Sequence, residues 1–85
     1  MKSFNKWITI DSSTLNFNFT PVQNPNGKKF FISVLNKEGI IFFEMKEDHY
    51  GHWLIVEQVP TWLLPAQPSL EAAIKSQVHT TLFNQ

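Results

Sequence analysis

The sequence contains no cysteine among its 85 residues. Disulfide bonds and thiolate metal sites are therefore excluded, although small domains often use them to supplement a thin hydrophobic core. A domain of this size buries only about 60–65% of the surface of its unfolded chain. We therefore expect support from another source, such as a second subunit. The lack of cysteine also suits a reducing compartment, and we expect a cytoplasmic protein.

The chain also lacks an excess of charge of either sign, with seven basic and seven acidic residues. Free-standing nucleic-acid-binding proteins usually carry a basic excess, because neutralising phosphates supplies most of their affinity. The charge balance therefore argues against nucleic acid as a partner. A net charge near zero also favours self-association.

Long hydrophobic runs are missing as well. No stretch approaches the roughly 20 apolar residues of a transmembrane helix, and the first residues contain no apolar run of signal-peptide length. We expect no membrane association. The chain has only three glycines, one in each of three predicted turns, so no glycine-rich phosphate loop exists. No serine lies in a nucleophile motif. We expect no cofactor, and nothing in the sequence indicates catalysis.

Aromatic and β-branched residues are abundant and occur in short runs separated by turn residues. Strict alternation of Leu15, Phe17 and Phe19 with asparagines predicts a half-buried strand. The segment 24–27, Asn-Pro-Asn-Gly, predicts a hairpin turn. The predicted strands cover residues 4–10, 14–22, 28–36, 39–47 and 51–59. A helix is predicted at about 69–82, with Ser69 as its N-cap and an apolar stripe formed by Leu70, Ala73, Ile74, Val78 and Leu82.

These elements predict a single α+β domain over residues 1–85. The expected architecture is a four- or five-stranded antiparallel meander sheet with one C-terminal helix packed on one face. The register of the 28–36 and 39–47 hairpin stays open. A four-residue loop places Phe30, Ile32 and Val34 on one face with Ile41, Phe43 and Met45, whereas a three-residue loop with a bulge reverses the second strand.

Both registers leave large apolar side chains on both faces of the sheet, although the chain has only one helix to cover them. An antiparallel sheet with one face in water normally alternates apolar and polar residues. We therefore expect the second face to bind a second copy of the chain or another protein. The candidate interface residues are Phe31, Phe42, Trp53 and Trp62.

Residues with catalytic or ligand-binding potential are few. His49 and His52, beside Asp48, have metal-ligand side chains, but a zinc site needs three or four converging ligands, so we expect a polar turn and no metal. Glu44 and Glu57 lie on neighbouring predicted strands, where Lys29 or Lys46 can neutralise them.

Three function hypotheses follow. The leading one is a small non-catalytic interaction module that self-associates through its second apolar sheet face. The alternative is a small-molecule-binding or enzymatic domain with a pocket between sheet and helix, where Tyr50, His52 and Glu57 are the candidate ligand residues. The third is single-stranded nucleic-acid binding by the basic and aromatic segment 26–32, which the charge balance disfavours.

Overall fold

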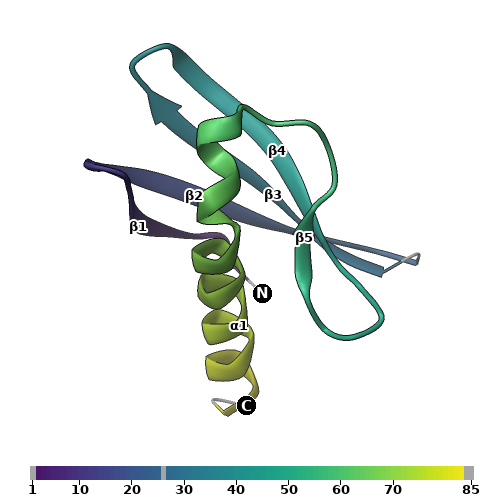
Figure 1. Ribbon diagram of the computed structural model, residues 1–85. Coiled ribbons are helices and arrows are strands. Elements are labelled where there is room, and N and C mark those ends of the chain that lie inside the picture. The colour runs from purple at the N-terminus through teal and green to yellow at the C-terminus, as the bar shows by residue number, and fades with distance from the viewer. Residues whose placement is uncertain (1, 26, 84–85) are drawn as a thin grey trace.

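The computed structural model describes residues 2–25 and 27–83, with side chains described for residues 2–23, 25 and 27–77. Five antiparallel strands form one sheet in sequence order, β1-β2-β3-β4-β5, and a 3₁₀ helix and an α-helix follow (Figure 1). This arrangement confirms the predicted α+β meander with a C-terminal helix. The elements are β1 (Phe4–Ile10), β2 (Ser13–Asn24), β3 (Gly27–Asn36), β4 (Gly39–Glu47), β5 (Trp53–Ile55), η1 (Thr61–Ala66) and α1 (Gln67–Phe83).

The turn between β3 and β4 determines which side chains share a face. Asn36 pairs with Gly39, so only residues 37 and 38 form the loop. The Asn36 side-chain oxygen accepts a hydrogen bond from the Glu38 N–H at 2.9 Å, and Gly39 has a φ of 128°, which favours glycine. The loop is thus two residues long instead of the predicted four, but the side chains share faces as in the first of the two predicted registers. One face therefore carries the apolar side chains of Phe30, Ile32, Val34, Ile41, Phe43 and Met45.

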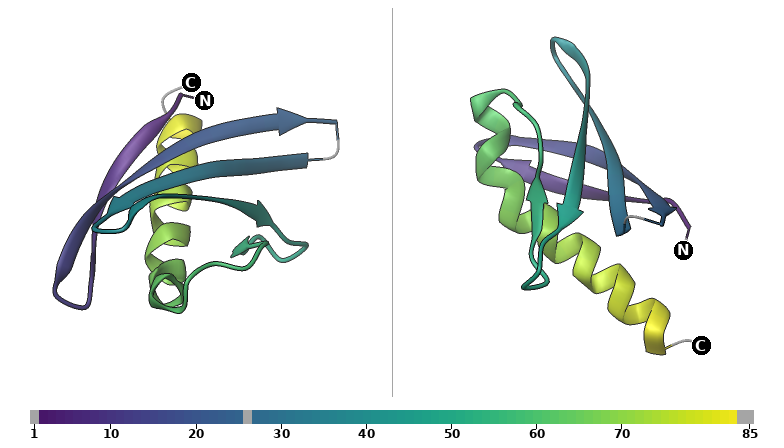
Figure 2. Two further views of the ribbon diagram at one scale, coloured as in Figure 1. Left: turned by 90° about the horizontal axis from the view of Figure 1, so that it is seen from above. Right: turned by 90° about the vertical axis from the view of Figure 1, so that its right-hand side faces the viewer.

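The hydrophobic core lies between this face and the two helical segments, which run along one side of the sheet (Figures 1 and 2). Four aromatic rings connect the strands within it. Phe30 has edge contacts with Phe4, Phe19 and Trp53, at centroid distances of 5.8, 6.3 and 5.3 Å. Phe4 also stacks on Phe19 at 4.5 Å. Phe30 is thus the centre of an aromatic cluster that joins β1, β2, β3 and β5.

Helix α1 contributes part of the predicted stripe to the core. Leu70, Ala73 and Ile74 are buried against the sheet. The predicted stripe residues Val78 and Leu82 lie outside the described side chains. The last turns of α1 extend past the sheet (Figures 1 and 2). The helix begins at residue 67 rather than 69 because η1 leads directly into it.

Strand β5 is shorter than the predicted 51–59 strand. Residues 51 and 52 belong to the turn, since the Gly51 N–H donates to the Asp48 carbonyl at 3.2 Å and the Asp48 N–H donates to the His52 carbonyl at 2.8 Å. At the other end, the Glu57 side chain, rather than a backbone carbonyl, accepts the Glu44 N–H at 2.8 Å. A carboxylate therefore replaces the strand partner, and the chain leaves the sheet.

The outer edge of β5 is covered by side chains of α1. The Trp53 N–H donates to Glu71 Oε2 at 2.9 Å, and the Ile55 N–H donates to Gln67 Oε1 at 3.0 Å. Two strand residues span about 6.7 Å and one helical turn rises about 5.4 Å, so side chains four apart on the helix can match alternate N–H groups of the strand. This arrangement fixes α1 to the last strand.

Candidate interaction surface

The face of the sheet opposite α1 carries a group of exposed apolar side chains. Leu35, Ile40 and Phe42 have 63%, 60% and 58% of their surface exposed. These residues lie on β3 and β4, and similar side chains follow on and after β5. We call the whole group the open-face patch, which consists of Phe31, Leu35, Ile40, Phe42, Leu54 and Val56.

The strand register makes this patch continuous. Leu35 is directly opposite Ile40, and Phe42 is opposite Ser33. The Phe31 and Phe42 rings lie on neighbouring strands with their centroids 5.9 Å apart. Single exposed apolar residues are common on protein surfaces, whereas a contiguous group usually marks a site of interaction. The patch is therefore the principal candidate site of this protein.

The predicted interface residues are divided between the two faces. Phe31 and Phe42 lie in the open-face patch. Trp53 is buried on the covered face, because it is opposite Glu47 and so shares a face with Met45. Trp53 therefore leaves the candidate surface, and Leu54 takes its place. Trp62 lies in η1, where it packs half-buried against the core.

An ion pair with no net charge borders the patch. Lys29 Nζ is 2.6 Å from Glu44 Oε2, beside Phe31, which is directly opposite Glu44. The hydrogen bond from Lys29 lowers the pKa of the Glu44 carboxyl, and the charges of Lys29 and Lys46 add to this effect. An acid catalyst needs a raised pKa, so Glu44 does not suit that role.

The other half of the open face, on β1 and β2, is polar. The Asn5 side-chain amide donates to Asn16 at 3.1 Å, and the hydroxyls of Thr9 and Thr14 are 2.8 Å apart. Both pairs link the two strands: Thr9 is directly opposite Thr14, whereas Asn5 and Asn16 form a diagonal pair. Trp7, with 63% of its surface exposed, is the large apolar exception in this half.

The three predicted ligand residues have different surroundings. Tyr50 is 85% exposed in the turn before β5. The Glu57 carboxylate accepts the Glu44 N–H, and His52 Nδ1 lies 3.2 Å from Glu71 Oε2. The side chains of Glu57 and His52 therefore contact different parts of the structure, and that of Tyr50 is exposed to solvent. None of the three lines the groove described below.

The turn before β5 is organised by the side chain of Asp48. Its Oδ1 accepts the N–H groups of Tyr50 and His52, both at 2.9 Å. These hydrogen bonds, that from His52 first, lower the pKa of the Asp48 carboxyl. The acidic residue of the His49 and His52 cluster thus has a structural role in the turn. Among the side chains that the structure describes, no three His, Asp or Glu groups are placed to hold a metal ion.

Glu71 connects α1 to the backbone of β5 and to the turn that precedes β5. Besides the Trp53 N–H, its Oε2 lies 3.4 Å from Lys75 Nζ and 3.2 Å from His52 Nδ1. The Trp53 hydrogen bond is the largest cause that lowers the pKa of the Glu71 carboxyl, and the contacts with His52 and Lys75 contribute. Ionised Glu71 therefore stabilises the fold.

The lowered pKa of Glu71 gives a testable pH dependence. A carboxyl group with a folded-state pKa below its ordinary value stabilises the fold at neutral pH, and that contribution is lost as pH falls through the folded-state pKa. Glu71→Gln keeps an oxygen acceptor for Trp53 but cannot ionise. We expect it to cost about 1 kcal/mol at neutral pH and to make the loss of stability below about pH 4.5 shallower.

Urea unfolding from about pH 6 to about pH 3 measures this effect. Glu38→Gln is the matched control, because Glu38 is exposed in the β3–β4 turn. The same pH profile in both variants would contradict a special role for Glu71.

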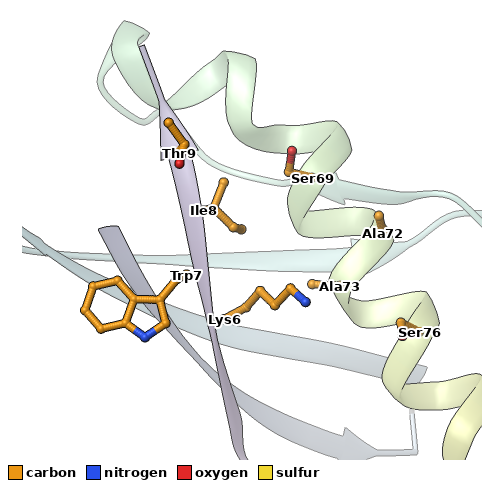
Figure 3. Close-up of a pocket in the computed structure, with 8 residues that line it drawn as sticks. All are labelled: Lys6, Trp7, Ile8, Thr9, Ser69, Ala72, Ala73 and Ser76. Atoms are coloured by element: carbon orange, nitrogen blue, oxygen red, sulfur yellow. The ribbon is translucent and has the colours of Figure 1, made fainter. Parts of the chain in front are cut away.

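A groove lies between β1 and α1 (Figure 3). It has a volume of about 380 Å³ and is lined by Lys6, Trp7, Ile8, Thr9, Ser69, Ala72, Ala73 and Ser76. The alternative hypothesis expected a pocket between sheet and helix, but it assigned Tyr50, His52 and Glu57 to it, and none of the residues that line this groove. The available signal was the spacing of Ser69, Ala72 and Ser76, which places three small residues on one side of the helix beside the apolar stripe.

No helix in the described part of the chain combines the length and the apolar character needed to cross a membrane. Comparisons with protein-family models, with curated proteins and with solved structures found no match.

Proposed function

We propose that this protein is a small, non-catalytic interaction module that forms a homodimer through its open-face patch. The observation that supports this proposal most strongly is the contiguous apolar half of the open face, across β3, β4 and the β5 region. The lack of cysteine supports a cytoplasmic location for this module.

The chain itself offers no cover for this patch among its described residues. The helices η1 and α1 lie on the other side of the sheet and pack on the core there (Figure 2). Phe42 and Ile40 would therefore stay in contact with water in an isolated chain. Burying such side chains is favourable by about 25 cal/mol per Å² of apolar surface, which gives association a driving force.

The charge around the patch suits a second copy. Lys29 and Glu44 neutralise each other at its border, and the whole chain has seven basic and seven acidic residues. Two identical patches can thus face each other without a large repulsion between like charges. Sheets that pack face to face are a common arrangement, about 10 Å apart, and a two-fold axis needs only one self-complementary surface.

The oligomeric state in solution tests this proposal. We expect sedimentation equilibrium of the full chain to show a concentration-dependent mass that approaches twice the chain mass of 9.9 kDa. A species that keeps the mass of one chain up to high micromolar concentration would reject the homodimer.

A further inference from the structure

The two edge strands, β5 and β1, differ in whether their outward backbone groups are hydrogen-bonded. At β5, side chains of α1 accept the outward N–H groups of Trp53 and Ile55. At β1, a two-residue loop pairs Ile10 with Ser13, and such closing pairs exchange both backbone hydrogen bonds. The alternation along the ladder then directs the backbone N–H and C=O groups of Asn5, Trp7 and Thr9 away from β2. Strand β1 is therefore an open edge.

The groove runs along this open edge. Figure 3 shows Lys6 and Ile8 of β1 on the side of α1, and Trp7 on the opposite side of the strand. The wall formed by α1 consists only of serine and alanine side chains. A strand added to β1 would lie about 4.8 Å away, with alternate side chains toward α1. The small residues of α1 leave room for those side chains.

The charge of the groove indicates which kind of strand can pair with the β1 edge. Lys6 is the only charged residue of β1, and it is exposed. Among the described residues, no carboxylate forms an ion pair with Lys6. Pairing β1 with β1 of a second copy would add another lysine and no carboxylate. Inward-pointing lysines on edge strands are a known device against such self-pairing. A strand that carries an acidic residue would instead complement Lys6.

We propose that the β1 edge and the groove beside it bind an extended, acidic segment of another protein by strand addition. Backbone hydrogen bonds to Asn5, Trp7 and Thr9 supply the affinity, small side chains of the segment face Ala72, and a carboxylate pairs with Lys6. This mode of recognition combines a sheet edge with side-chain pockets. The site is separate from the open-face patch and does not depend on the proposed dimer.

Selection of random peptides displayed on phage against the full chain provides the probe. We expect enrichment of sequences that alternate small or β-branched residues and contain at least one aspartate or glutamate. A synthetic peptide of the enriched sequence is then titrated into ¹⁵N-labelled protein. The amides of Asn5, Trp7 and Thr9 should shift and become protected from hydrogen exchange.

Two variants test the groove itself. Lys6→Glu should lower the affinity for the acidic peptide about tenfold, and a lysine in place of the acidic peptide residue should restore binding. Ala72→Trp should remove most binding, because the indole fills the groove, while the exposed position of Ala72 preserves the fold. Phe42→Asp, on the opposite face, should leave peptide binding unchanged even where it abolishes dimerisation.

Several results would overturn the strand-addition site. These are the absence of any enriched sequence, binding that maps to the open-face patch, and equal affinity of Lys6→Glu and the natural chain. Protection of the three β1 amides in concentrated protein without peptide would assign the edge to a second copy instead.

Discussion

Phe42→Asp is expected to weaken self-association at least about 100-fold while the monomer keeps its fold. Phe42 lies in the middle of the open-face patch, in contact with Phe31 and directly opposite Ser33. In a dimer the new carboxylate would be buried against apolar side chains without a partner, which costs several kcal/mol. In the monomer the same carboxylate is solvated, because position 42 is 58% exposed. Sedimentation equilibrium and circular dichroism measure the two effects separately.

Asn18→Asp is the matched control for this variant. Asn18 is exposed in the same cross-strand row, since it is opposite Ser33, but it lies in the polar half of the open face. The control introduces the same negative charge and should change the dissociation constant by less than about threefold. An equal loss in both variants would attribute the effect to net charge, and the apolar patch would lose its role.

Phe30→Ala is expected to remove about 3–5 kcal/mol of stability, whereas Phe31→Ala should remove less than about 1 kcal/mol. These neighbours in sequence point to opposite faces. Phe30 is 2% exposed and contacts three other aromatic rings, and Phe31 is 42% exposed. Because small domains have only about 5–15 kcal/mol in total, the first variant should be close to unfolding.

Urea unfolding of both variants at low protein concentration measures this difference, with Phe42→Asp present in each so that association does not add to stability. Losses of similar size would mean that both faces of the sheet are packed within one chain. That result would also remove the basis for an open face.

The prediction of the fold from sequence rested on turns and alternation. The Asn-Pro-Asn-Gly segment and Gly39 predicted the hairpin turns. The alternation of Leu15, Phe17 and Phe19 with asparagines predicted which side chains of β2 are buried. These are local signals that need no knowledge of the rest of the chain. The structure confirms the order of the strands and the helix on one face.

The register of β3 and β4 could not be predicted in the same way. A change of one residue in the loop reverses which side of β4 faces the core, and both faces of β4 are apolar enough to be buried. For the same reason the sequence could not decide between Trp53 and Leu54 for the second face. The hydrogen bond between the Asn36 side chain and the Glu38 N–H accompanies the observed register.

The candidate sites, too, could be predicted only in part from the sequence. Phe31 and Phe42 were predicted from composition, because strands rich in aromatic residues exceed what one helix can cover. The groove depends on the position of α1 over β1, which is a tertiary property. The links of His52 to Glu71 and of Glu57 to Glu44 also join residues far apart in the sequence, at separations of 19 and 13 residues.

The side chains of Gln67 and Glu71 on β5 also limit how large an assembly can grow. A fibril built edge to edge requires two free strand edges in every chain, one to receive a neighbour and one to offer. In this chain the N–H groups of Trp53 and Ile55 are already bonded to α1, so β5 cannot accept a further strand there. Growth of a fibril through the β5 edge is therefore blocked.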